Sequence, residues 1–201
     1  GVEEELHGLV VVHLDGQPRR IRTPKQAIRA GMALVPRDRR HQGLILPFTT
    51  ADNINLASLP ETATFGWERR GIAEQKARDW IEQLAIRPGR PALPVRYMSG
   101  GNQQKAILAR WLGTDARLFI LDEPTLGVDI GARRDIYQRT RQLADQGRAV
   151  LVSSSDAPEL LGLCDRILVL WRGALAANLP TRGLTLDALL VAINGGQEPS
   201  P

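Results

Sequence analysis

Two adjacent carboxylates, Asp122 and Glu123, are the residues of this 201-residue sequence best placed to do chemistry. They follow the continuous apolar run 118–121, which predicts a buried strand. In open parallel sheets ligands bind beyond the carboxyl ends of the strands, and neighbouring strand residues point to opposite faces. The two acids therefore suit different tasks: one could hold a hydrated Mg²⁺ and the other could orient or deprotonate a water. An ordinary strand followed by a polar loop is the alternative.

A second candidate site is the run Ser-Gly-Gly-Asn-Gln-Gln-Lys at 99–105, which opens a predicted helix. The first N–H groups of a helix lack partners within it, and the helix dipole is positive there. Gly100 and Gly101 would let an anion approach the backbone closely, so the segment could bind a phosphate. Taken alone, a plain helix capped by Ser99 after a glycine turn explains the pattern more simply.

Alternating strand and helix patterns predict the elements that position these groups. Short apolar runs predict strands at 32–35, 118–121, 149–153 and 166–170. Helices are expected at 99–112, 132–146 and 157–163, with a last helix at 185–193 capped by Thr185. Apolar strands spaced by helices are typical of an α/β fold with a mostly parallel sheet, covered by helices on both faces.

The first half of the chain departs from this alternation. A hairpin is expected at 9–21 and a short helix at 24–29, capped by Thr23. Further helices are expected from Thr49, with Thr50 or Asp52 as the cap, and over 67–87. We therefore expect a helical subdomain at 49–97, inserted into an α/β core formed by 1–48 and 98–195. A disordered tail is expected at 196–201.

Composition excludes several classes of protein. The hydrophobic fraction is 43% and the charged fraction 24%, unlike a disordered chain, a collagen or a coiled coil. The net charge of +4 comes from scattered residues, so no nucleic-acid partner is expected. The single cysteine, Cys164, cannot form an intrachain disulfide, and no apolar run approaches the ~20 residues that span a bilayer. We therefore expect a soluble protein of a reducing compartment.

The order of the motifs resembles the ATP-binding cassette of ABC transporters, over about residues 9–195. The residues that carry it are Met98–Lys105, then 118–124, then Thr125-Leu126-Gly127-Val128-Asp129. These sequence motifs are similar to those of the second of two tandem cassettes in importers of monosaccharides such as ribose, galactose and xylose. The segment Val35–Leu44 resembles the corresponding loop of that second cassette. The resemblance implies a P-loop NTPase-like fold.

Some site residues are implied by this resemblance at the interface between cassettes. Ser99–Asn102 match the signature motif, in which Ser99, Gly100 and Gly101 contact the γ-phosphate of a nucleotide held by the partner cassette. Asp129 matches the D-loop aspartate, which communicates between the two cassettes.

Other residues are implied at the catalytic edge of the sheet. Asp122 matches the Walker B aspartate near Mg²⁺, and Glu123 the general base. Arg37 stands where the family has the Q-loop glutamine, and Ser155 where it has the switch histidine. Arg37 cannot accept a hydrogen bond, and Ser155 cannot act as an imidazole acid or base.

A further departure concerns the phosphate-binding loop. None of the three lysines, Lys25, Lys76 and Lys105, lies in a Gly-x-x-x-x-Gly-Lys-[Ser/Thr] setting. We therefore expect that the chain begins just after this loop, lacks the N-terminal part of the cassette and is inactive alone.

The resemblance also implies ligands and partners for the full-length protein. These are ATP with Mg²⁺, a companion cassette, and a membrane permease that the helical subdomain would face, served by a periplasmic or extracellular sugar-binding protein. The expected location is the cytoplasm, peripheral on the inner face of the cell membrane, and the chain alone could self-associate. Two alternatives stay open: a soluble ABC-type ATPase acting on nucleic acid or ribosomes, and a non-catalytic cassette that acts only as a dimer face.

Overall fold

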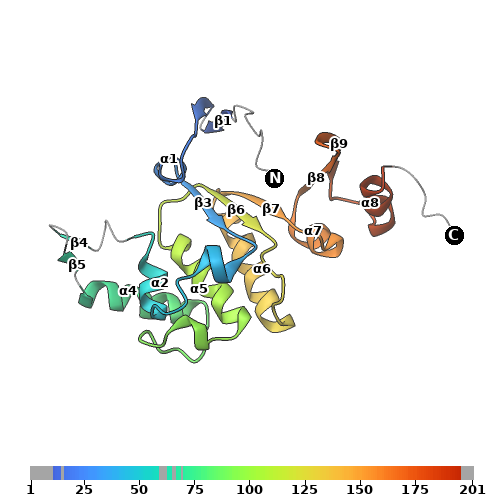
Figure 1. The fold of residues 1–201 in the computed structure, drawn as a ribbon. Helices are drawn as coiled ribbons and strands as arrows, with labels where there is room; N and C mark the ends of the chain where they lie inside the picture. Colours follow the sequence, from blue (N-terminus) through green and yellow to red (C-terminus); the bar gives the residue numbers. More distant parts are fainter. Residues whose placement is uncertain (1–10, 15, 59–62, 65–66, 69, 196–201) are drawn as a thin grey trace, which may run out of the picture.

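The computed structural model describes residues 11–14, 16–58, 63–64, 67–68 and 70–195 (Figure 1). A three-stranded parallel sheet lies at the centre, in the order β3 (Met32–Val35), β6 (Leu118–Asp122), β7 (Ala149–Ser153). Asp122 lies opposite Ser153 in the register. All three strands therefore end at one edge of the sheet, where the loops after them meet.

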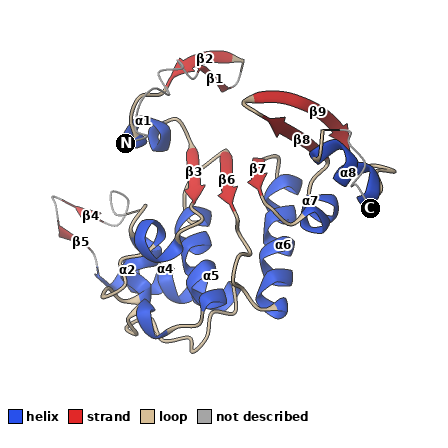
Figure 2. Ribbon diagram, turned by 45° about the vertical axis from the view of Figure 1, so that its right-hand side comes forward, coloured by secondary structure: helices blue, strands red, loops and turns tan. Residues whose placement is uncertain are grey.

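Helices α5 (Gly100–Leu112) and α6 (Ile130–Asp145) run side by side along one face of this sheet (Figure 2). Phe119 and Leu121 of β6 are buried there, in one hydrophobic cluster with Ile107 of α5. On the opposite face Leu34 and Leu151 are 49% and 52% exposed. The predicted α/β fold with a parallel sheet is confirmed, but the expected cover by helices on both faces is wrong for these strands, because Leu34 and Leu151 stay exposed on the second face.

The middle of the chain is helical, as predicted, with α2 (Thr50–Asn55), α4 (Arg70–Gln83) and the 3-10 turn η2 (Val95–Tyr97). Ile54 of α2 and Ile81 of α4 belong to the same hydrophobic cluster as β6. The elements of this region therefore pack directly on the core.

Three predicted boundaries in this region are wrong. The cap of α2 is Thr49, not Thr50 or Asp52, because Thr49 and Asp52 form a reciprocal capping box. Helix α4 does not begin at Trp67, because β5 (Trp67–Glu68) pairs with β4 (Ala63–Thr64). It ends at Gln83, just before Ala85, whose positive φ of 47° is incompatible with a continuing helix.

The described N-terminal elements follow the prediction; residues 9 and 10 of the expected hairpin lie outside the described residues. Strands β1 (Val11–Leu14) and β2 (Gln17–Arg20) form an antiparallel hairpin, and α1 (Pro24–Arg29) begins after Thr23, whose hydroxyl caps it. The charged loop after β3 contains a π-helical turn, η1 (Arg39–Gly43), capped by Asp38.

The C-terminal part corrects one strand. β8 (Arg166–Trp171) does not extend the parallel sheet; it pairs antiparallel with β9 (Ala174–Pro180), a strand that the sequence analysis missed. Helix α7 (Ala157–Leu163) precedes this hairpin, and α8 (Leu186–Ile193), capped by Thr185, packs against it. The expected disordered tail, 196–201, lies outside the described residues.

Candidate functional site

Glu123 and Ser155 meet at the carboxyl edge of the sheet. Asp122 ends β6, and Glu123 follows it with a positive φ of 47°. The Glu123 backbone N–H donates to the Ser153 carbonyl at 2.8 Å, and its Oε1 accepts from the Ser155 backbone N–H at 2.9 Å. The loops after the neighbouring strands β6 and β7 thus bring together two residues that are 32 positions apart.

Asp122 and Arg37 border a common groove at the same edge. This open groove, of about 600 Å³, is also lined by Arg39, Leu126 and Gly127. Arg37 is exposed, and Asp122 is partly exposed. The structure therefore places the predicted metal ligand and the residue that the sequence analysis matched to the Q-loop glutamine around one accessible space.

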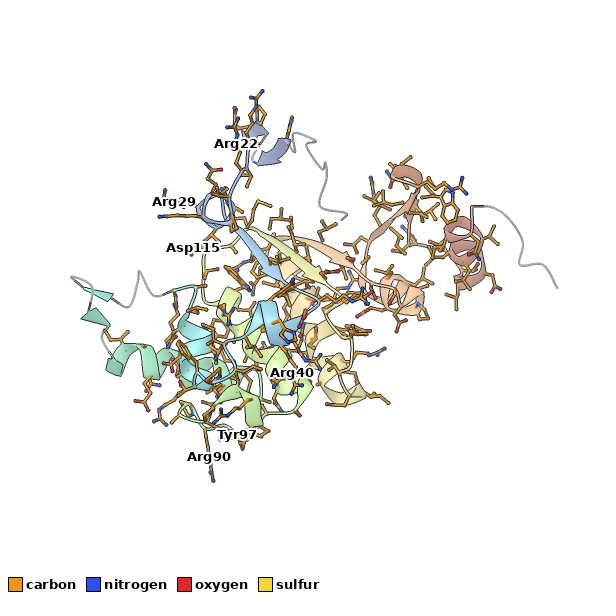
Figure 3. The ribbon with its side chains drawn as sticks, viewed as in Figure 1. Arg22, Arg29, Arg40, Arg90, Tyr97 and Asp115 are labelled. Atoms are coloured by element: carbon orange, nitrogen blue, oxygen red, sulfur yellow. The ribbon has the colours of Figure 1, made fainter. Side chains whose placement is uncertain are left out.

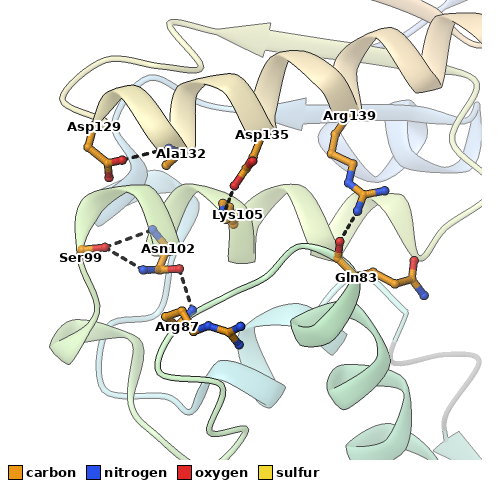
Figure 4. Close-up of polar contacts among 9 residues, drawn as sticks. All are labelled: Gln83, Arg87, Ser99, Asn102, Lys105, Asp129, Ala132, Asp135 and Arg139. Atoms are coloured by element: carbon orange, nitrogen blue, oxygen red, sulfur yellow. Dashed lines mark hydrogen bonds and ion pairs between the residues drawn. The ribbon is translucent and has the colours of Figure 1, made fainter.

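Ser99 caps α5, and Asn102 ties this helix start to a neighbouring loop. The Ser99 Oγ accepts from the Asn102 backbone N–H at 3.5 Å and from its Nδ2 at 2.9 Å. The Asn102 Oδ1 accepts from the Arg87 backbone N–H at 2.8 Å (Figure 4). The Asn102 amide is thus engaged within the chain.

Gly101 permits the close approach of α5 to α6. A Cβ at Gly101 would lie 2.7 Å from the Ala132 Cβ and 3.1 Å from the Asp129 Oδ2. Asp129 itself caps α6, because its Oδ1 accepts from the Ala132 backbone N–H at 2.9 Å (Figure 4). The predicted signature and D-loop residues are therefore neighbours in the structure.

Arg39 is a residue of this site that the sequence analysis did not single out. Its Nη1 donates to the Leu126 carbonyl at 2.7 Å, and its Nη2 donates to the Gly127 carbonyl at 3.4 Å. A Cβ at Gly100 would lie 2.6 Å from the same Nη2. No local sequence signal identifies this contact, because its partners lie 87 and 88 residues away.

Glu159 is the second residue that sequence reasoning missed. It is 4% exposed, and its carboxylate accepts from the Thr125 Oγ1 at 2.8 Å and from the Ser154 hydroxyl. Burial and the nearby Glu159 carboxylate together raise the pKa of Tyr137. A charged residue inside the short helix that follows Ser155 was the available signal.

The side chains at this site suit a metal ion that is coordinated mainly by phosphate oxygens and water. Among the described residues, no three His, Cys, Asp or Glu side chains are grouped to hold a metal ion. Mg²⁺ commonly takes one or two protein carboxylates and completes its shell with phosphate oxygens and water, so Asp122 fits that role. The start of α5, beside the Arg39 guanidinium, is likewise suited to an anion.

None of the helices in the described part of the chain is both long and apolar enough to cross a membrane.

Comparison with known proteins identifies relatives. Residues 7–126 match the ABC transporter family. The ribose import ATP-binding protein of Geobacillus kaustophilus is 42% identical over 189 residues, covering 92% of this chain and 37% of that protein. The xylose import ATP-binding protein of Burkholderia ambifaria is 43% identical over 181 residues, covering 90% of this chain and 35% of that protein. The chain thus spans little more than a third of these relatives.

Solved structures agree on the fold. A dimeric bacterial ABC transporter cassette superposes with a TM-score of 0.70 at 19% identity, covering 87% of this chain and 74% of that one. A dimeric post-hydrolysis structure of an ATP-binding cassette, bound to ADP and Pi, gives a TM-score of 0.69 over 86% of this chain and 73% of that one.

Proposed function

This chain belongs to the ABC transporter family of ATP-binding cassettes, and from that premise we propose that it is the second cassette of an ATPase subunit that drives monosaccharide import. The names of the ribose and xylose import relatives support the substrate class. The observation that carries the proposal is the contact of Glu123 with the Ser155 backbone N–H beside Asp122, at the edge where parallel sheets bind ligands.

We assign hydrolysis to the two carboxylates at this edge. Glu123 would orient and deprotonate the attacking water, with its carboxylate held by the Ser155 N–H. Asp122 would hold Mg²⁺ in the adjacent groove. MgATP, when bound, supplies the scissile phosphoanhydride bond and most of the metal's ligands. Arg37 would act in this groove as a hydrogen-bond donor and not as an acceptor.

We assign the start of α5 to the interface with a companion cassette. Ser99, Gly100 and Gly101 would face the nucleotide that the companion holds, with Asn102 fixing the helix start. Asp129, exposed at the start of α6, would contact the companion directly. The dimeric structures of similar cassettes support such an assembly.

The helical subdomain, 49–97, is the proposed contact with a membrane permease at the cytoplasmic face. Phe48 and Tyr97 are 47% and 65% exposed at its border, and their segments are joined by the bond from the Val95 N–H to the Phe48 carbonyl, 3.1 Å long. A sugar-binding protein would deliver the monosaccharide to that permease on the other side.

The distribution of arginines disfavours an ATPase that acts on nucleic acid. Figure 3 shows Arg22 and Arg29 at one end of the molecule and Arg90 at the opposite end. A nucleic-acid-binding surface gathers its basic residues on one face. A cassette that serves only as a dimer face predicts instead that Glu123 contributes nothing to transport.

Uptake by cells tests the proposal. The full-length subunit, carrying Glu123→Gln in this cassette, is expressed together with its permease in cells that lack their own ribose and xylose importers. Uptake of labelled ribose and xylose is then measured. Loss of general-base catalysis should lower uptake of the transported sugar by at least tenfold. Asp145→Asn, at an exposed carboxylate on α6, is the matched control. Uptake equal to the control would refute catalysis by this cassette and favour the dimer-face role.

A further inference from the structure

The turn Thr125–Gly127 connects the two parts of the proposed site. It lies between Glu123 and Asp129, so its conformation sets the spacing of the catalytic carboxylate from the interface aspartate. Two backbone bonds shape it: the Leu126 N–H donates to the Glu123 carbonyl, and the Val128 N–H donates to the Thr125 carbonyl, both at 3.2 Å.

Two charged side chains hold this turn, one from the segment that follows each neighbouring strand of the sheet. Arg39 follows β3, and its two terminal nitrogens donate to the Leu126 and Gly127 carbonyls. Glu159 follows β7, and its buried carboxylate accepts from the Thr125 hydroxyl. Because β3 and β7 flank β6, the turn after the central strand is tied to both of its neighbours.

We propose that Arg39 and Glu159 are positioning residues that clamp the Thr125–Gly127 turn and so hold Glu123 and Asp129 in register with each other. The planar fork of arginine can bind two successive carbonyls, which a lysine ammonium cannot do with the same geometry. A buried carboxylate is costly unless its oxygens accept hydrogen bonds, so Glu159 favours the conformation that presents the Thr125 and Ser154 hydroxyls.

The same clamp reaches the start of α5. A Cβ at Gly100 would lie only 2.6 Å from the Arg39 Nη2. On the other side Ser154, held by Glu159, precedes the Ser155 N–H that binds Glu123. A movement of the turn would therefore also affect the positions of the proposed signature motif and of the proposed general base. The effect on the signature motif and on the general base rests on the proposed function; the existence of the clamp does not.

Hydrogen exchange on the chain itself tests the Glu159 half of the clamp. Thr125→Val removes one buried hydroxyl and should speed exchange of the Leu126 and Val128 amides by about tenfold. Thr140→Val is the matched control: both threonines are 3% exposed, but the Thr140 hydroxyl donates to the Ile136 carbonyl within α6. Unchanged exchange in the turn, or equal acceleration by both variants, would overturn the proposal.

The Arg39 half is tested in the same way with Arg39→Lys and Arg39→Met. Both should speed exchange of the Leu126 and Val128 amides, because both lose the fork that binds two carbonyls. Arg134→Met, which removes a charge from an exposed arginine on α6, should leave these amides unchanged. Full protection retained in Arg39→Met would overturn the role of this residue.

Steady-state kinetics of the assembled full-length subunit test the functional consequence. Positioning predicts that Thr125→Val and Arg39→Lys lower kcat for ATP by about tenfold while KM changes less than twofold, whereas Thr140→Val changes neither. A raised KM with unchanged kcat would contradict a positioning role. Absence of ATPase activity in the unaltered subunit would refute the proposed function, and the exchange experiments would still decide whether the clamp exists.

Discussion

The backbone N–H of Ser155 donates to the Glu123 Oε1 at 2.9 Å. Within this contact the donor belongs to the main chain and not to the serine side chain. A serine at the position that the sequence analysis matched to the family's switch histidine is therefore compatible with a held carboxylate at Glu123. The loop conformation, and not the identity of the side chain, determines the contact.

Ser155→Ala should accordingly change little. In the full-length subunit we expect its ATPase rate to stay within about threefold of the unaltered protein, because alanine keeps the backbone donor. Glu123→Gln in the full-length subunit should lower the rate of this cassette by about a hundredfold or more, the contribution typical of a general base. ATPase assays under single-turnover conditions provide the comparison. A loss in Ser155→Ala as large as that in Glu123→Gln would assign a catalytic role to the hydroxyl.

Gly101→Ala should destabilise the chain by about 1–3 kcal/mol, as overpacking in a close contact does. Its new Cβ would lie 2.7 Å from the Ala132 Cβ, an atom fixed to the backbone of α6. Gly162→Ala in α7 is the control, because a Cβ there meets no atom within 4 Å and alanine favours a helix. Urea unfolding of the three proteins measures the difference. Equal stability of the two variants would mean that α5 and α6 lie further apart.

Local patterns predicted most of the elements but could not choose between equivalent signals. Strand 149–153 and helix 157–163 have the predicted bounds, because apolar runs and capping residues mark them clearly. At 49–52 three of four residues can cap a helix, and the reciprocal bonds of Thr49 and Asp52 decide the boundary. Strand 174–180 contains no β-branched residue and lacked a signal; its pairing with 166–171 defines it.

The site likewise contains residues that local sequence signals predicted and residues that such signals could not identify. The predicted residues Asp122 and Glu123, at a strand end, and Ser99, at a helix start, lie where local sequence signals placed them. Asp129 was named only through the family resemblance; α6 begins at Ile130 and not at the predicted residue 132, so that Asp129 caps it. Arg39 acts on a turn 87 residues away, so only the packing of the loops after β3 and β6 brings the two together. Such contacts leave no periodic pattern in a single sequence.

The more exposed face of the central sheet should make the isolated chain self-associate. Leu34, Ile120 and Leu151 lie side by side across the three strands, and exposed apolar groups of this kind tend to be covered by association. Leu151→Lys should shift the population toward monomer in light scattering. Ile72→Lys is the control, because the residue is likewise 53% exposed but belongs to α4 and not to the sheet. A monomeric unaltered chain would contradict this expectation.

The pKa of Tyr137 should report the charge on Glu159. Burial and the Glu159 carboxylate raise this pKa above the ordinary value of 10.0. Because the unfolded chain loses the proton earlier, stability should fall as the pH rises above 10. Glu159→Gln should lower the Tyr137 pKa without restoring the ordinary value, since burial remains. Ultraviolet titration in a Tyr97→Phe background isolates this phenol, because the chain has two tyrosines. An unchanged pKa in Glu159→Gln would show that the carboxylate does not act on the ring.

The chain alone should not bind MgATP tightly. In P-loop proteins the phosphate-binding loop supplies the backbone cradle and the lysine that hold the β- and γ-phosphates, and no such motif occurs in these 201 residues. Asp122 and Glu123 then have no positioned substrate, and phosphoryl transfer depends chiefly on positioning. Calorimetry should therefore detect no micromolar affinity.

When an active companion cassette is added, any stimulated hydrolysis should depend on Ser99 and Gly100 more than on Glu123, because α5 would face the companion's nucleotide. Micromolar binding by the chain alone, or turnover without a partner that Glu123→Gln abolishes, would contradict this division of roles.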